Sequence, residues 1–158
     1  MKILNLLLLL ISLSACKIDV TGTGTGNPLW DSEPSNLTDV EGRETFPLYY
    51  SICEVLADCN HEIVYGDCVE KVSALGNVNE SLGLQNYQFS SFQEIYMAIN
   101  NGHIEMNVDF HWQCEQEVLN LSCELPSVQE AYTPDSAHHY ERVPGMLHEV
   151  CKKAFESN

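Results

Sequence analysis

The sequence predicts an all-α fold: a compact, disulfide-stapled bundle of about five helices that follows a flexible tether. Apolar residues recur in several segments at the three- and four-residue spacing of an amphipathic helix. No long run alternates apolar and polar residues as a half-buried strand does. Six cysteines lie among the helical segments, and an even number in a secreted chain of this size is typical of three disulfides.

The N-terminus has the layout of a secretory signal. A lysine is followed by an apolar run over residues 6–11 and by small residues at 12–15. The run is much shorter than the roughly 20 apolar residues of a membrane-spanning helix. A cysteine comes next, and Leu13-Ser14-Ala15-Cys16 resembles the lipobox of bacterial lipoproteins. The resemblance implies that residues 1–15 are a lipoprotein signal peptide and that Cys16 becomes the acylated N-terminus.

This N-terminus would anchor the protein to the lipid bilayer, because more than one acyl chain holds a protein stably at a membrane. We therefore expect an extracytoplasmic bacterial membrane lipoprotein. Lys17, instead of an acidic residue, follows the cysteine and resembles the pattern that sorts lipoproteins to the outer membrane, where the source has one. The alternative is an ordinary signal peptide that ends beside a cysteine. Three Asn-x-Ser/Thr sites favour this alternative: Asn36, Asn79 and Asn120.

The chain is strongly acidic. It has 7 Lys and Arg against 23 Asp and Glu, and only Lys2 of these lies in the signal. The mature chain therefore keeps 6 basic and 23 acidic side chains, a formal net charge of −17. This charge argues against nucleic acid and anionic lipid headgroups as partners, since both require patches of Lys and Arg. A solvated acidic surface is the simplest explanation, and a surface for cations or a basic partner is the alternative.

Residues 16–44 are expected to form a lipidated, flexible tether. They begin with a Thr-Gly repeat over residues 21–26, which has little side-chain surface to bury and is costly to order. Residues 29–44 are rich in Asp, Glu, Ser and Pro, and we interpret them as mostly disordered. The disulfide-stapled helical domain is then residues 45–158.

The first three helices are predicted from apolar spacing and end signals. The first covers residues 47–58 and begins at a proline. The second covers residues 67–75, and residues 77–88 after it are predicted to be a loop. The third follows the capping box Ser91-x-x-Glu94 and ends at Asn101-Gly102. The inward faces are marked by these residues: Leu48, Ile52, Val55 and Leu56; Val69, Val72 and Leu75; Ile95, Ala98 and Ile99.

Two longer helices and a short turn complete the prediction. One helix covers residues 108–122, with Asp109 as a candidate N-cap. Ser127-x-x-Glu130 is a candidate cap for a short turn before a polar loop at residues 133–142. The last helix begins near Pro144. The apolar residues expected to be buried in the two helices are these: Val118, Leu119 and Leu121; Leu147, Val150, Cys151, Ala154 and Phe155.

The cysteine spacings favour one disulfide and exclude another. If the first two helices are antiparallel neighbours, Cys53 and Cys68 come level, and their bridge would stabilise by about 3 kcal/mol. Cys114 and Cys123 on one helix would be separated by about 13.5 Å, against the roughly 4.4–6.8 Å that a disulfide allows between Cα atoms. They would also lie on opposite faces of that helix. The other two pairs are chosen among the arrangements left open: Cys53–Cys68, Cys59–Cys123 and Cys114–Cys151 form the expected set.

Three stretches share a recognisable spacing: Cys53-x5-Cys59-x8-Cys68, then Ala98-Ile99-x-x-Gly102-x-Ile104, then Cys114-x4-Leu119-x-Leu121-x-Cys123. With the lipobox and the Gly/Thr linker, this pattern is similar to that of small cysteine-rich helical lipoproteins of bacteria. The resemblance covers residues 1–26 and 50–155. It implies an anchored extracytoplasmic helical domain with no assigned activity, and it carries over no catalytic residue.

No motif of a known catalytic or metal centre is present. The sequence lacks a Cys-x-x-Cys pair, a Gly-x-Ser-x-Gly elbow, a His-Glu-x-x-His motif and an EF-hand loop. Cysteines held in disulfides offer no thiolate for catalysis. The densest acid–histidine group is interpreted as an exposed polar loop and not as a metal site: Asp135, His138, His139 and Glu141. We therefore expect no catalytic, cofactor or metal site.

Two aromatic pairs need an interpretation. His111 beside Trp112 is interpreted as packing or surface and not as a ligand. Tyr49 and Tyr50 are expected to divide between core and surface, with a binding groove as the alternative.

The expected function is a non-enzymatic module that binds a protein or an envelope component. The anchor, the spacer and the missing catalytic motifs favour it. One alternative is a carrier of a small apolar ligand with a hollow helical core. The other is an enzyme or metal carrier, which requires that at least three histidines and nearby acids converge, from this set: His103, His111, His138, His139 and His148.

Overall fold

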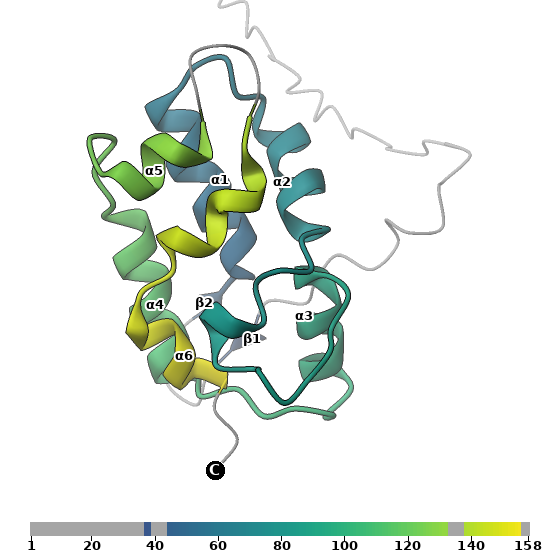
Figure 1. The fold of residues 1–158 in the computed structure, drawn as a ribbon. Coiled ribbons are helices and arrows are strands. Elements are labelled where there is room, and N and C mark those ends of the chain that lie inside the picture. Colours follow the sequence, from purple (N-terminus) through teal and green to yellow (C-terminus); the bar gives the residue numbers. More distant parts are fainter. Residues whose placement is uncertain (1–36, 39–43, 133–137, 156–158) are drawn as a thin grey trace, which may run out of the picture. The chain divides into compact units, whose positions relative to one another are not determined.

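The computed structural model describes residues 37–38, 44–132 and 138–155, which belong to one unit of the chain (Figure 1). The predicted signal peptide, Cys16 and most of the predicted tether lie outside these residues. Within the described part, the chain forms six α-helices, two 3₁₀ helices and one pair of short strands. This confirms the prediction of an all-α, disulfide-stapled fold. None of the helices in these ranges is long and apolar enough to cross a membrane.

The elements follow one another along the chain in this order: β1 (Leu37–Thr38), β2 (Glu44–Thr45), α1 (Leu48–Cys59), α2 (Tyr65–Ser73), η1 (Glu80–Leu82), α3 (Phe92–Asn100), α4 (Val108–Leu119), α5 (Pro126–Ala131), η2 (Tyr140–Met146) and α6 (Glu149–Phe155). The strands are antiparallel, with Leu37 opposite Thr45. They fall partly within the predicted tether, so this short segment is paired in the structure. The antiparallel pair leads directly into α1.

Helix α1 is the centre of the packing. Seven of its 12 residues are buried, and it contacts both α2 and α4. Helix α4 packs on α6, and α5 packs on η2. In Figure 1, α5 and η2 lie in front of α1. The apolar positions predicted for the first helix are all buried: Leu48, Ile52, Val55 and Leu56. The apolar spacing therefore predicted the buried face of this helix correctly.

Aromatic rings fill the space between α1, α3, α4 and α6. Tyr96 on α3 is edge-on to Tyr49, His111 and Phe155, with ring centroids 5.8–6.0 Å apart. Phe92, one turn before Tyr96, is 5.6 Å from the Tyr49 ring. Edge-to-face contacts of this kind stabilise beyond the apolar area that they bury, by about 0.5–1.5 kcal/mol for each pair.

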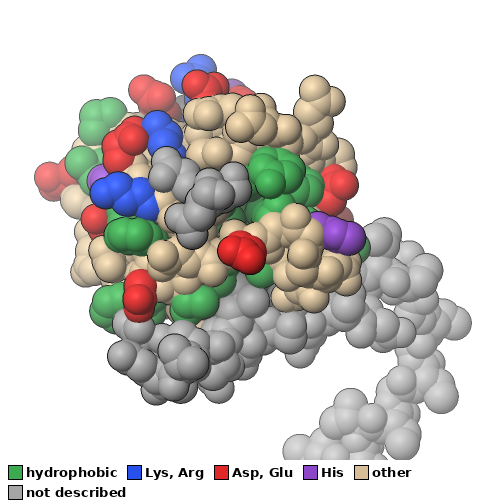
Figure 2. Space-filling model, turned by 90° about the horizontal axis from the view of Figure 1, so that it is seen from below, with side chains coloured by type: hydrophobic (Ala, Val, Ile, Leu, Met, Phe, Trp, Pro, Cys, Tyr) green, Lys and Arg blue, Asp and Glu red, His purple; other side chains and the backbone are tan. Residues whose placement is uncertain are grey.

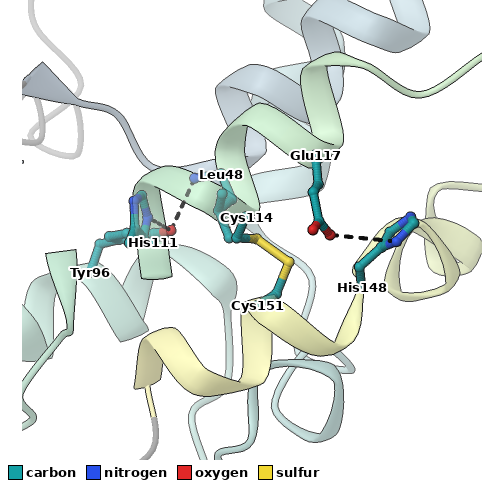
Figure 3. The surroundings of a disulfide bond; sticks show 7 residues. All are labelled: Leu48, Tyr96, His111, Cys114, Glu117, His148 and Cys151. Carbon is teal, nitrogen blue, oxygen red and sulfur yellow. Dashed lines mark hydrogen bonds and ion pairs between the residues drawn. A yellow bond between two sulfur atoms is a disulfide. The ribbon is translucent and has the colours of Figure 1, made fainter. Parts of the chain in front are cut away.

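Three disulfides join separate elements of the fold. Cys53–Cys68 connects α1 to α2, and Cys114–Cys151 connects α4 to α6 (Figure 3). Cys59–Cys123 connects the last residue of α1 to the segment between α4 and α5. These are the same three pairs that we expected from the sequence.

Helix α4 is shorter than predicted, and this removes one argument for the pairing. It ends at Leu119, because the Leu121 N–H donates to the Val118 carbonyl, three residues back, at 3.0 Å and so does not continue the α-helical pattern. The Asn120 side-chain amide also donates to the Gln116 carbonyl at 2.7 Å. Cys123 therefore lies beyond the helix, and the comparison of Cys114 and Cys123 on one continuous helix was wrong. Leu119 and Leu121 are consequently only partly buried. The N-cap is Asn107, whose side chain accepts from the Phe110 N–H, and not Asp109.

The C-terminal third also differs from the prediction. The last helix begins at Glu149, whereas Pro144 lies inside η2. Leu147 separates the two helices because its backbone is extended. Ser127 does not cap α5. That helix starts with Pro126 in its first turn after an extended Leu125, without a side-chain cap.

The predicted loop at residues 77–88 contains η1 and contributes to the core. Val78, Leu82 and Leu84 are almost completely buried, and α6 packs against η1. Their spacing of four and two residues fits neither a helix nor a strand, so periodicity could not reveal them. Helix α3, in contrast, has the predicted boundaries. Ser91 caps it by accepting from the Glu94 N–H at 3.1 Å.

Candidate binding surface

The histidines that could have formed a metal or catalytic group are dispersed. His139 Nδ1 lies 2.9 Å from Glu141 Oε1, and His148 Nδ1 lies 3.6 Å from Glu117 Oε2, each as an isolated exposed pair. Asp135, the fourth member of the predicted acid–histidine group, lies outside the described residues. In the described ranges, no three His, Cys, Asp or Glu side chains are placed to hold a metal ion.

One histidine is buried in a polar pair. The Tyr96 hydroxyl accepts the Leu48 N–H at 3.0 Å and lies 2.9 Å from His111 Nε2 (Figure 3). His111 Nδ1 has no hydrogen-bond partner within the described part of the chain. Burial lowers the pKa of His111 to about 4 and raises that of Tyr96 well above its ordinary value. Both side chains are therefore neutral near pH 7 and closed to solvent, which suits a structural pair and not a catalytic one.

A buried carboxylate lies one turn further along α4. Glu115 accepts from the Ser51 hydroxyl at 3.3 Å and from the Phe46 backbone N–H. Burial raises the pKa of Glu115, and these two hydrogen bonds oppose the rise. The carboxylate thus joins the start of α1 to α4, and both of its identified partners belong to the protein. This also assigns it a structural role.

The accessible candidate site is on the outer side of α1 and the start of α2. Tyr50, Glu54 and Asp58 follow one another at four-residue intervals, so they form one stripe along α1. Glu54 and Asp58 are exposed, and Tyr50 is half-buried. At the start of α2, Val64 is 62% exposed and Tyr65 is 44% exposed. We refer to these five residues as the α1–α2 surface.

Electrostatics shows that the two parts of this surface lie close together. The pKa of Tyr65 is raised by partial burial and then by the negative charge of Glu54 and by Tyr50. The Cys53–Cys68 disulfide fixes α2 against α1. The tyrosine rings and the carboxylates therefore form one mixed apolar and acidic surface that the fold holds in place.

The carboxylates of this surface have no ion pair within the described residues. The basic side chains in these ranges contact other groups: Lys71 the Tyr140 ring, Arg142 the Glu130 carboxylate, Lys152 the Glu149 carboxylate and Lys153 the Phe110 ring. Figure 2 shows one end of the domain. There, basic groups lie beside acidic ones, and apolar side chains form several separate groups.

The sequence revealed half of this surface. Tyr49 is buried in the core and Tyr50 reaches the surface, as expected for that pair. Val64 and Tyr65 were not identified, because only the closure of the turn between α1 and α2 brings Tyr65 close to Glu54. Trp112 is partly exposed, whereas its neighbour His111 is completely buried.

No protein-family model, no curated protein and no solved structure matches the chain. The function must therefore be inferred from the residues and the structure.

Proposed function

We propose that the protein is a membrane-anchored extracytoplasmic lipoprotein whose helical domain is a non-enzymatic binding module for a protein or envelope component. The anchor rests on Leu13-Ser14-Ala15-Cys16, with acylated Cys16 held in the bilayer and the residues between Cys16 and β1 as spacer. In this arrangement the domain faces the extracytoplasmic space. The outer membrane is its location where the source has one.

The α1–α2 surface is the observation that carries the binding function. Tyrosine side chains are enriched at protein interfaces, because one residue offers both a large apolar area and a hydroxyl group. Tyr65 and Val64 are exposed on a rigid support, since α2 is linked to α1 by a disulfide. Unlike the buried Tyr96 and His111, these side chains can meet a partner without any opening of the fold.

The charge of the surface specifies the partner further. Glu54 and Asp58 are exposed and have no ion pair among the described residues, and the whole chain has a net charge of −16. Complementary charge accelerates association and selects partners. We therefore propose a partner segment with basic residues, whose aliphatic stems would cover the tyrosine rings.

The anchor is tested by intact mass. Protein from its own membrane is alkylated without reduction, weighed, and then reduced, alkylated and weighed again. The expected mass is that of residues 16–158 with acyl chains, and no alkylation is expected before reduction. A mass without lipid would contradict the anchor, and alkylation before reduction would contradict the closed disulfides.

The binding surface is tested by site-specific photo-crosslinking in the native envelope. A photo-reactive amino acid at Tyr65 is compared with one at Met97, which is 52% exposed on α3. We expect a discrete crosslinked partner at position 65 that is lost in Glu54→Lys/Asp58→Lys. The matched variant Glu80→Lys/Glu105→Lys reverses two exposed charges outside the α1–α2 surface, and it should keep the crosslink at position 65. Equal crosslinking at both positions, or insensitivity to the α1 charges, would refute this surface.

A further inference from the structure

The three disulfides differ sharply in their access to solvent. Four cysteines have no exposed surface: Cys53, Cys68, Cys114 and Cys151. Cys59 is half-buried and Cys123 is exposed, in the short segment between α4 and α5. A disulfide is cleaved by direct attack of a thiolate on one of its sulfur atoms, so access is a condition of the reaction. Cys59–Cys123 is the disulfide of the described domain that meets this condition in the folded state.

The charges beside this disulfide favour some thiols over others. Asp58 precedes Cys59 and Glu124 follows Cys123, and both side chains are exposed. The basic side chains in the described ranges are held against other partners, at Tyr140, Glu130, Glu149 and Phe110. The attacking species is a thiolate, so two negative charges slow the attack most for a thiol that carries a further negative group, and they do so less as salt screens them.

Cleavage of Cys59–Cys123 would free the segment between α4 and α5 from the end of α1, while the other two disulfides stay intact. The Cys123 segment leads into α5, which packs on η2, and the Tyr132 hydroxyl lies 3.5 Å from the Cys123 carbonyl. Helix α2 remains bound to α1 through Cys53–Cys68, and α6 remains bound to α4 through Cys114–Cys151. The two cysteine thiols would then appear at the edge of the α1–α2 surface, because Cys59 follows Asp58.

We propose that Cys59–Cys123 is a redox-modification site, which an uncharged or cationic thiol or dithiol reduces while the other two disulfides persist. A reductant thiolate attacks the Cys123 sulfur, the S–S bond breaks and Cys59 leaves as a thiolate. The second thiol of a dithiol, or a second molecule of a monothiol, then attacks the reductant's sulfur in this mixed disulfide and releases Cys123 as a thiolate. Two electrons and two protons pass to the protein, and the dithiol, or the pair of monothiols, becomes a disulfide.

The test uses the full chain with its disulfides intact, under native conditions. Three thiols of similar size are compared at equal thiolate concentration: 2-aminoethanethiol, 2-mercaptoethanol and 2-mercaptoethanesulfonate. Free cysteines are trapped by alkylation and located by peptide mass. We expect Cys59 and Cys123 to be released at least about tenfold faster than the other four cysteines. Reduction by the sulfonate should be the slowest of the three, and the difference in rate from the other thiols should become smaller at high salt. Reaction of all six cysteines in one phase, or of another pair first, would overturn the proposal.

Two variants test separately whether charge affects the rate of reduction and whether the fold requires this disulfide. Asp58→Asn/Glu124→Gln keeps the side-chain shapes and should accelerate reduction by the sulfonate, whose thiolate form carries two negative charges, by roughly fivefold. The acceleration should be smaller for 2-mercaptoethanol, which attacks as a monoanion, and smallest for 2-aminoethanethiol, which attacks as a zwitterion without net charge. Cys59→Ser/Cys123→Ser should leave the other four cysteines as protected as in the parent. If they instead become reactive, the bridge is a structural requirement, and an exchange site at this position is ruled out.

Discussion

The Tyr96 hydroxyl lies 2.9 Å from His111 Nε2 in a part of the core that is closed to solvent. The same hydroxyl accepts the Leu48 N–H, one of the N–H groups at the start of α1 that have no partner within the helix. Tyr96 thus connects α3 to both α1 and α4 through a single oxygen atom. His111 and Glu115, which are one turn apart on α4, link the same region through polar groups.

Replacement of Tyr96 by Phe should destabilise the fold by about 2–3 kcal/mol, because it leaves two buried polar groups without their partner. The free energy of unfolding in urea measures this loss. Tyr87→Phe is the control, since the Tyr87 ring stacks on Phe89 at 5.5 Å and is only half-buried. Its effect should stay within about 0.5 kcal/mol. Equal effects of the two variants would contradict the role of the Tyr96 hydroxyl.

His111 should make the protein less stable in acid. Its pKa is about 4 when folded, against 6.5 as the ordinary value. The unfolded chain therefore binds the proton first, and stability falls as the pH drops from 6.5 to 4, by about 3 kcal/mol in total. Unfolding curves across this range should show the slope in the parent and lose it in His111→Gln. A slope that survives in His111→Gln would contradict this assignment.

Glu115 should act in the opposite direction. Its pKa is raised in the folded protein, so the folded state holds the proton more tightly. Its contribution to stability is full below the unfolded pKa and is lost as the pH rises through the raised folded pKa. Glu115→Gln removes this term, and acidification should then cost more stability than in the parent. A shallower acid loss in Glu115→Gln would show that the carboxylate is not buried as described.

Two glycines should respond in opposite ways to replacement by alanine. A Cβ at Gly76 would lie 2.7 Å from the Ser90 carbonyl oxygen, so Gly76→Ala should cost about 1–3 kcal/mol. A Cβ at Gly66, in the first turn of α2, would meet nothing within 4 Å. Gly66→Ala should stabilise by about 0.5–1 kcal/mol, because alanine loses less backbone freedom in a helix. Thermal unfolding of the pair measures both signs, and a neutral Gly76→Ala would contradict the close approach.

The capping serine of α3, Ser91, can be compared with Ser127 near the start of α5. Ser91→Ala removes the acceptor for the Glu94 N–H and should cost about 1 kcal/mol. Ser127, which the sequence suggested as a cap for α5, makes no such hydrogen bond. Ser127→Ala should therefore change stability by no more than about 0.5 kcal/mol. Equal losses in denaturant unfolding would mean that Ser127 does act as a cap.

Local interactions explain where the sequence succeeded. The start of α3 depends on Ser91 and Glu94, and its end on Gly102, whose φ of +69° favours glycine. Each of these signals acts within a few residues, so it can be found without knowledge of the fold. The inward face of α1 was predicted for the same reason, because its apolar spacing belongs to one helix.

Tertiary packing explains where the sequence did not suffice. The burial of Val78, Leu82 and Leu84 depends on α6, which lies more than sixty residues later in the chain. The capping pattern at Ser127 was locally plausible, but Pro126 and the extended Leu125 define that helix start instead. In each case a distant or competing contact decided the outcome.

The sequence by itself determined the helical class, the presence of three disulfides and the acidic character of this protein, because composition, spacing and cysteine number express them directly. Only the tertiary structure decided that His111 is buried against Tyr96, that Tyr65 joins the stripe on α1, and that Cys59–Cys123 alone among the described disulfides is open to solvent. These features depend on distances between residues that are far apart in the chain. Such distances are fixed when the helices pack, and no local pattern records them.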